Sequence, residues 1–154
     1  MELVHEFTWR VVSTTPHEVG AGPYGTRLYY ELPDATIRGE RLNGKMVGKG
    51  GDWMLVGPDS YVQIDVRAQV QTDDGAIIYI RYRGPVEVTE KFQQAADTFG
   101  ETDFKDQLIR TYWELETGDS RYTWVNRTIF VGEGRLLSNG PGLLGMEHLV
   151  YRLA

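Results

Sequence analysis

The chain has 154 residues, of which 41% are hydrophobic and 25% charged, a composition typical of one globular domain. The sequence has no cysteine, which excludes disulfides and thiolate metal sites and fits a reducing compartment. The formal net charge of -6 disfavours nucleic acid as a partner, because an acidic surface repels phosphates. The first residues lack the basic and apolar regions of a signal peptide, and no apolar run reaches membrane-spanning length. We therefore expect a cytoplasmic protein with no membrane partner.

Strict alternation of apolar and polar residues predicts β-strands along most of the chain. The clearest run is 62–71, where Val62 and every second residue to Val70 are apolar and the residues between them are polar. Clusters of turn-forming residues, such as Asn43-Gly44 and Asp73-Asp74-Gly75, separate the runs. The predicted strands are 3–12, 25–32, 35–42, 45–48, 52–57, 61–72, 76–83, 108–116, 121–131 and 145–153.

One segment has helical periodicity instead. Apolar residues recur at helical spacing between Phe92 and Phe99, Thr89 can cap the start, and Gly100 can end the helix. The pattern predicts a short helix over about 89–99. This helix is expected to plug one end of a barrel or to pack on its outside.

The number of strands and the lack of a linker or repeat define the expected architecture. With about ten strands and one helix, the sequence predicts an all-β fold, a single closed antiparallel β-barrel. Residues 1–154 are expected to form one domain, because no low-complexity segment divides them.

Two hairpins can be given a register, because cross-strand partners point to the same face. A three-residue loop with Gly75 in the left-handed region pairs Thr72 with Ala76 and separates an apolar face from a polar one. A two-residue loop at Gly118-Asp119 pairs Trp113 with Trp124. The same register pairs Thr111 with Asn126 and gives a largely aromatic face.

The loop Gly48–Trp53 contains four small or flexible positions followed by an acid and an indole. Such a loop allows the backbone to approach a ligand closely, with Asp52 and Trp53 as contacts. It equally fits a bulged entry into a strand, with Trp53 in the core.

A polar row, Asp65, Arg67, Tyr79 and Arg81, lies along one face of the 61–83 hairpin. Facing water, this row is an ordinary solvated sheet surface. Facing the barrel lumen, it places a carboxylate, two guanidiniums and a phenol in a dry pocket, where their pKa values shift as acid–base chemistry requires.

The three histidines, His5, His17 and His148, lie far apart in the sequence without metal-ligand spacing. The sequence therefore predicts neither a metal site nor a cofactor.

Five ordered motifs carry a resemblance to a known family. They are Gly22-Pro23-Tyr24-Gly25-Thr26-Arg27, Gly50-Gly51-Asp52-Trp53, Ile64-Asp65-Val66-Arg67, Thr72-Asp73-Asp74-Gly75-Ala76 and Tyr122-Thr123-Trp124-Val125-Asn126-Arg127. Together they resemble the uncharacterised-protein family 0311, also catalogued as domain of unknown function 3237, over nearly the whole chain.

The resemblance implies a lipocalin-like β-barrel with a central pocket. It also implies that the polar positions matching Asp52, Asp65, Arg67 and Asn126 recur, which favours the lumen-facing interpretation of the polar row. Some members of the family are associated with cofactor-free lyase or decarboxylase steps on phenolic or other small molecules.

The leading functional hypothesis is a cofactor-independent lyase, decarboxylase or isomerase acting on an aromatic or hydrophobic substrate. Asp52, Asp65, Arg67 and Tyr79 are its predicted catalytic residues. Trp53, Arg81, Trp113, Trp124 and Asn126 are its predicted substrate contacts. The partner is expected to be an aromatic or carboxylate-bearing small molecule.

Two alternatives stay open. The same pocket also suits a non-catalytic carrier or sensor of a small ligand. A barrel filled with side chains instead suits a structural or homo-oligomeric module.

Overall fold

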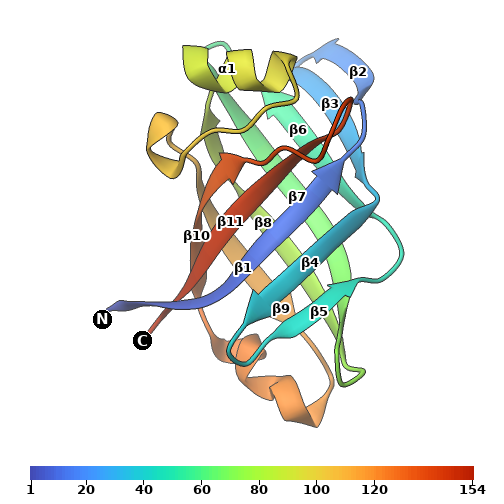
Figure 1. The fold of residues 1–154 in the computed structure, drawn as a ribbon, viewed down its shortest axis with the longest axis vertical. Coiled ribbons are helices and arrows are strands. Elements are labelled where there is room, and N and C mark those ends of the chain that lie inside the picture. The colour runs from blue at the N-terminus through green and yellow to red at the C-terminus, as the bar shows by residue number, and fades with distance from the viewer.

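The computed structural model describes residues 1–154, and strands make up most of it, which confirms the predicted all-β barrel (Figure 1). The helices are α1 (Glu90–Asp97) and the 3-10 helices η1 (Phe104–Asp106) and η2 (Ser120–Arg127). The strands are β1 (Leu3–Ser13), β2 (His17–Gly22), β3 (Gly25–Leu32), β4 (Asp34–Gly39), β5 (Asn43–Met46), β6 (Gly50–Val56), β7 (Tyr61–Thr72), β8 (Ile77–Glu87), β9 (Arg110–Glu116), β10 (Phe130–Leu136) and β11 (Leu144–Leu153).

Eight of these strands form the closed ring, in the order β7-β5-β4-β1-β11-β10-β9-β8, and the β7–β8 pairing completes it. The ring is antiparallel throughout and uses eight strands, fewer than the ten or so predicted for the barrel. Strands β6, β3 and β2 form an extension that pairs with the upper part of β7 through β6. We call these three strands the wall extension.

Proline and glycine explain why this extension separates from the ring. Pro16 lies between β1 and β2, and Pro33 lies between β3 and β4. Because proline has no N–H to donate, it interrupts a ladder of hydrogen bonds. Gly48, with φ +65, allows the left-handed turn between β5 and β6.

The β7–β8 hairpin has the register predicted from the sequence. The Thr72 N–H donates to the Ala76 carbonyl over 2.8 Å, and Gly75 has the expected positive φ of +98. Val66 therefore lies opposite Tyr82, and Arg67 opposite Arg81.

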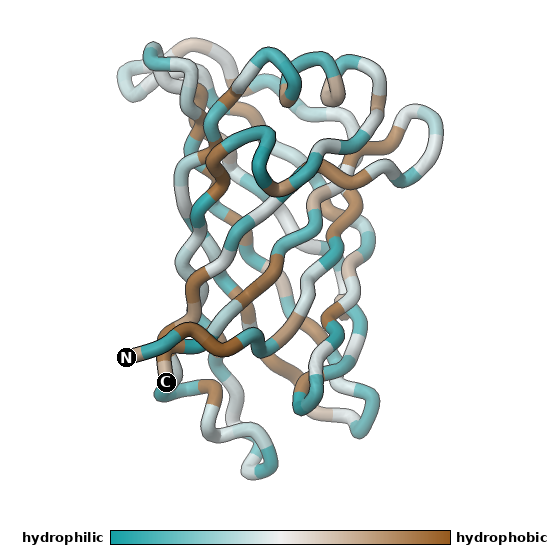
Figure 2. The backbone as a smooth tube through the Cα atoms, turned by 60° about the vertical axis from the view of Figure 1, so that its left-hand side comes forward, coloured by the Kyte–Doolittle hydropathy of each residue, from teal (hydrophilic) through white to brown (hydrophobic).

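Hydrophobic and hydrophilic residues alternate along the strands, as the colours along the tube show (Figure 2), and the apolar residues of β7 and β8 are mostly the buried ones. Together with residues from the other elements, these form one core cluster of 24 buried residues. Below the middle of the barrel this core is mostly aromatic: Tyr82 stacks on Trp113 with ring centroids 3.8 Å apart, and Phe7 and Trp9 pack edge-on against Trp113. Aromatic rings bury much area in such edge-on and stacked pairs, so this half of the barrel is solid.

The predicted helix is confirmed as α1, which lies across the upper end of the barrel (Figure 1). Thr89 caps it by accepting the Phe92 N–H over 3.2 Å. The helix ends earlier than predicted, because Phe99 has a positive φ of 53 and the Gly100 N–H bonds back to Ala95. None of the helices has the length and apolar character needed to cross a membrane.

The predicted strand 121–131 is wrong in its first part. Asp119 accepts the Arg121 N–H over 2.9 Å and starts η2, which covers the lower end of the barrel. Trp113 therefore lies opposite Phe130 of β10, and the predicted pairing of Trp113 with Trp124 is incorrect. Because the Asp119 side chain caps η2, the chain continues into a 3-10 helix after the loop instead of turning back in a two-residue hairpin.

Two strands were missed, and glycine explains both. Strand β2 contains Gly20 and Gly22, which lower strand propensity. Strand β10 carries Gly132 and Gly134 on its inward face. A Cβ at Gly132 would lie 2.8 Å from the Trp113 indole nitrogen, and one at Gly134 would lie 2.9 Å from the His148 ring.

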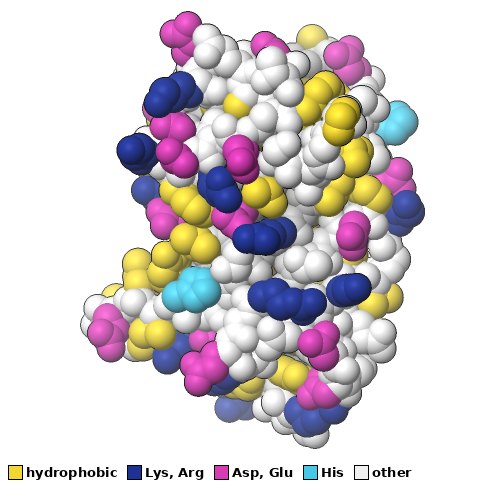
Figure 3. Space-filling view, viewed as in Figure 1, with side chains coloured by type: hydrophobic (Ala, Val, Ile, Leu, Met, Phe, Trp, Pro, Cys, Tyr) yellow, Lys and Arg dark blue, Asp and Glu magenta, His cyan; other side chains and the backbone are white.

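Charged side chains lie mainly on the outside, where both signs are interspersed over β1, β4 and β11 (Figure 3). One well-buried carboxylate there is Glu147, which accepts hydrogen bonds from Arg10 over 2.6 Å and from Arg135 over 2.9 Å. Burial alone would raise the pKa of Glu147, but the two guanidiniums outweigh it and the pKa is lowered.

Replacing Gly84 with alanine is expected to destabilise the barrel. A Cβ at this position of β8 would lie 1.9 Å from the Arg110 carbonyl oxygen of β9, so the backbones would have to move apart. We expect a loss of about 1–3 kcal/mol in the free energy of unfolding, measured by urea denaturation. Gly118→Ala is the matched control, because nothing lies within 4 Å of its added Cβ. Equal stability of the two variants would contradict the close approach.

Candidate functional site

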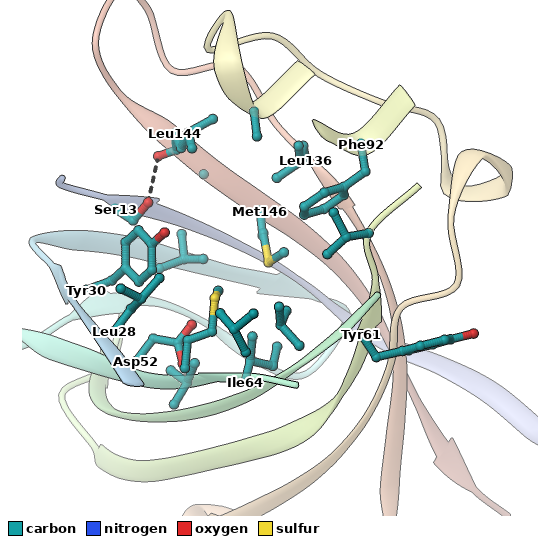
Figure 4. A pocket seen from close by; sticks show the side chains of 18 of the residues that line it. Ser13, Leu28, Tyr30, Asp52, Tyr61, Ile64, Phe92, Leu136, Leu144 and Met146 are labelled. Carbon is teal, nitrogen blue, oxygen red and sulfur yellow. Dashed lines mark hydrogen bonds between the residues drawn. The ribbon is translucent and has the colours of Figure 1, made fainter. Parts of the chain in front are cut away.

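The upper half of the barrel encloses a cavity of about 410 Å³ (Figure 4). It is lined by 23 residues, 17 of them hydrophobic, from the ring, the wall extension and α1. A mostly apolar cavity of this size with a few polar groups is the usual form of a small-molecule site.

Asp52 of β6 is the carboxyl group in this cavity, and only 7% of it is exposed. Its Oδ1 accepts the backbone N–H of Asp65 over 3.0 Å. The regular pairing of β6 with β7 is interrupted just beyond Asp52, between the Asp52–Val66 and Leu55–Gln63 pairs. The Asp52 side chain therefore accepts the Asp65 N–H at the place where the backbone ladder between β6 and β7 is interrupted.

The second oxygen of Asp52, Oδ2, has no protein hydrogen-bond partner and is accessible from the cavity. Burial is the main cause that raises the pKa of Asp52 to about 7; the Asp65 N–H opposes this shift, and the Asp65 carboxylate adds to it. Near neutral pH this carboxyl can thus both accept and donate a proton, as a general acid–base group must.

Two tyrosines lie at the level of Asp52. Tyr30 of β3 is its direct cross-strand partner, and Tyr82 of β8 lies opposite Val66, the partner of Asp52 on β7. Burial, and then the charge of Asp52, raise the pKa of both phenols, so both keep their protons. The Trp9 indole N–H donates to the Tyr82 hydroxyl over 3.1 Å and fixes it.

Beneath these groups lies the buried aromatic core. His148 is fully buried, neither ring nitrogen has a hydrogen-bond partner, and burial lowers its pKa to about 3. It packs edge-on against Tyr82, with ring centroids 5.1 Å apart. The neutral imidazole is a packing element of the aromatic core.

The mouth lies at the α1 end. There the Ser13 hydroxyl donates to the Leu144 carbonyl over 3.4 Å, which links the end of β1 to the start of β11 (Figure 4). Phe92 reaches in from α1, and Leu136 of β10 and Met146 of β11 also line the cavity. Tyr61 points away from the cavity, and its hydroxyl bonds to Glu87.

The polar row lies on the outside, so the lumen-facing interpretation favoured by the family resemblance is wrong, and the alternative of a solvated sheet surface is correct. Asp65, Arg67, Tyr79 and Arg81 are on the outer faces of β7 and β8, while Val66, Ala68 and Ile80 between them are buried. Arg81 forms an ion pair with Asp65, with two nitrogen–oxygen contacts of 3.3 Å. An enclosed barrel interior takes the apolar face of an alternating hairpin, because unpaired buried charges are costly.

The predicted substrate contacts also lie away from the cavity. Trp53 is 42% exposed on the outer wall, where it packs against Tyr29. Trp113 is in the solid core below the cavity. Trp124 lies at the lower end beneath the Arg41 guanidinium, 3.7 Å from its ring centre.

Asn126, another predicted substrate contact, instead holds a loop together. Its amide bonds both the N–H and the carbonyl of Thr117, over 2.8 and 2.9 Å, and closes the loop after β9. Of the predicted site residues, the structure brings only Asp52 to the cavity.

Sequence reasoning missed Tyr30 and Tyr82 as cavity residues. Tyr82 shares the apolar face of the correctly predicted hairpin, so its position could have been found. Tyr30 follows Tyr29 directly, and its inward orientation depends on the β3–β6 register.

The structure has no group of three or more His, Asp or Glu side chains placed to hold a metal ion. The polar side chains that line the cavity are the carboxyl of Asp52, the Gln93 amide and several hydroxyls.

Comparison with known proteins identifies relatives over the whole barrel. The sequence model of the family described as "Protein of unknown function (DUF3237)" matches residues 1–153. A UPF0311 protein of Clostridium acetobutylicum is 30% identical over 107 residues, which cover 70% of this chain and 68% of that protein.

Solved structures share the fold. A conserved protein of unknown function from Rhodopseudomonas palustris superposes with a TM-score of 0.84 at 20% identity, covering 99% of this chain and 97% of that one. A protein from Penicillium herquei described as an enzyme superposes with a TM-score of 0.67 at 16% identity, covering 96% and 93%.

Asp52→Asn is expected to remove a pH dependence of stability. The native carboxyl keeps its proton up to about pH 7, whereas the unfolded one releases it near 3.8. Between these values the native state binds the extra proton, so the wild type loses stability as the pH rises. We expect the unfolding free energy of Asp52→Asn minus that of the wild type to rise by a few kcal/mol as the pH increases across this range. Each pKa unit of difference between the native and unfolded states contributes about 1.36 kcal/mol.

Urea denaturation from about pH 4 to about pH 8 measures this difference. The titration of His148 is common to both proteins and cancels. Asp34→Asn, at an exposed position without a side-chain partner, is the control and should show no such rise. A difference that stays constant with pH would show that Asp52 has an ordinary pKa.

Proposed function

The chain belongs to the DUF3237 family, and from that premise and the cavity geometry we propose that it is a cofactor-independent enzyme that moves protons on a small hydrophobic substrate. The observation that supports this most is Asp52, a single carboxyl in an apolar cavity with one oxygen held by the protein and the other free. Such an environment tunes a carboxyl for proton transfer near neutral pH.

The proposed step uses Oδ2 of Asp52 as the base. It takes a proton from a weakly acidic C–H or O–H of the substrate, and negative charge develops on a substrate oxygen. The Tyr30 hydroxyl, which has no protein partner, donates a hydrogen bond to that oxygen. A phenol donor in a dry site stabilises an oxyanion better than water does.

The proton then has two destinations. Its return from Asp52 to another substrate atom gives an isomerisation. Its transfer from Asp52 to a departing leaving group, as the bond to that group breaks, gives an elimination. Neither outcome gains or loses electrons, so the reaction is balanced with proton transfer alone. The Penicillium herquei protein with this barrel is described as an enzyme, which supports a catalytic use of the fold.

The test uses 5-nitrobenzisoxazole, a neutral bicyclic C–H acid. Removal of its ring proton by a base breaks its N–O bond and releases a coloured phenolate. We expect the wild type to accelerate this ring opening, with a rate that rises through about pH 7 as Asp52 ionises. Asp52→Asn should reduce the rate by about 10²-fold or more, because its amide accepts the Asp65 N–H but takes no proton.

Two variants serve as controls. Asp34→Asn makes the same chemical change at an exposed site, and Arg67→Ala removes a guanidinium from the outer polar row. Both should keep the wild-type rate. If the probe binds, as followed by tryptophan fluorescence, but opens equally fast with the wild type and Asp52→Asn, the acid–base proposal fails and the cavity belongs to a carrier.

A further inference from the structure

The structure assigns a substrate class to this cavity: we propose that it accepts uncharged molecules with one polar end and rejects carboxylates and phosphates of the same size. This inference rests on the proposed function, because it concerns the ligand of the same site. It differs from the expectation of a carboxylate-bearing ligand, which depended on arginines inside the barrel.

The first argument is the charge of the lining. Asp52 is the only carboxyl among the lining residues, and none of the others is Lys, Arg or His. An anion entering the cavity would lose its water without gaining a cationic partner, and it would approach a second negative group. Burying an unpaired charge is among the costliest events in a protein interior.

The second argument is where the cations are. Along β7 and β8 the arginines point outward, and Arg81 is already paired with Asp65 on the outer surface. The buried row that includes Val66 and Ile80 separates them from the cavity. The overall charge of -6 adds to the repulsion of anions.

The third argument is the distribution of polar groups within the cavity. Tyr30, Asp52 and Tyr82 lie on one level of neighbouring strands at the inner end. Toward the mouth most of the lining is apolar, with Phe92 and Leu144 near α1 (Figure 4), and its polar side chains, Ser13, Ser60 and Gln93, carry no charge. A ligand therefore enters with its polar end first and leaves its apolar end against the helix.

A cation is not favoured either. One oxygen of Asp52 is engaged by the Asp65 N–H, so an ammonium would have a single carboxylate oxygen to replace its hydration shell. In a buried ion pair of this kind, the free energy lost by dehydrating the two charges roughly cancels the energy gained from their attraction. A neutral hydroxyl needs only one acceptor and keeps its apolar surface in contact with the wall.

The experiment compares three probes of equal shape: 2-naphthol, 2-naphthoate and 2-naphthylmethylammonium. Their binding is measured by calorimetry at about pH 6 and about pH 8. We expect the naphthol to bind about tenfold or more tightly than either ion at both pH values. The disadvantage of the naphthoate should grow between the two pH values, because Asp52 becomes ionised.

Leu28→Arg tests the argument by adding the missing cation. Leu28 is a half-buried lining residue of β3, two residues from Tyr30. We expect this variant to improve naphthoate binding about tenfold, while Leu28→Met keeps the preference for the naphthol. Asp52→Asn provides a second measurement that does not depend on Leu28→Arg folding: it should abolish the pH-dependent part of the naphthoate disadvantage.

The outcomes separate this inference from the proposed function. Naphthoate binding within about twofold of naphthol in the wild type overturns the charge selection, whether or not 5-nitrobenzisoxazole reacts. Tighter binding of the ammonium, or binding of none of the probes, also overturns it. Selective naphthol binding without any Asp52-dependent ring opening supports the charge selection and rejects the catalytic function.

Discussion

The hydrogen bond from the Asp65 N–H to Asp52 is the contact on which the cavity depends most. It holds a carboxyl among hydrocarbon side chains without a neutralising cation and fixes which oxygen faces the ligand space. Without that donor the carboxyl would be a buried acceptor with no partner, and the side chain would have reason to turn toward water. With it, the group remains inside, and burial keeps its proton affinity high.

The barrel combines two regions with different packing. In the lower half, Trp9, Trp113 and Tyr82 interlock, and Gly132 and Gly134 leave room for the large rings. In the upper half the barrel is hollow, β3 and β6 of the wall extension form part of the wall around the cavity, and α1 lies across the end. Tyr82 belongs to both regions, since its ring packs in the core and its hydroxyl lies at the bottom of the cavity.

The sequence was sufficient for the fold class, the α1 helix and the register of the β7–β8 hairpin. These features depend on local periodicity and on a glycine that a specific loop requires. The face of that hairpin was assigned incorrectly, because alternation separates two faces without stating which one is inside. The apolar composition of the Val66 face was the better guide, since a closed interior selects hydrocarbon.

Other errors have a different origin. Trp124 and Asn126 were placed on a strand because two-residue loops are common, but Asp119 caps a helix there instead. The approach of Tyr30 to Asp52 depends on long-range pairing between β3 and β6, which no local pattern encodes. Asp52 could be predicted as a site residue because it directly follows a glycine-rich segment, where the backbone can approach a ligand closely.

The prolines that divide the wall have a mechanical consequence. Asp52 and Tyr30 are carried by the wall extension, whereas Tyr82 is fixed in the closed ring. Pro16, Pro33 and Gly48 mark the seams between these parts, so a change of side chains on β3 or β6 leaves the hydrogen bonds of the ring in place. The side chains that shape one wall of the cavity can therefore vary without loss of the backbone pairing that closes the barrel.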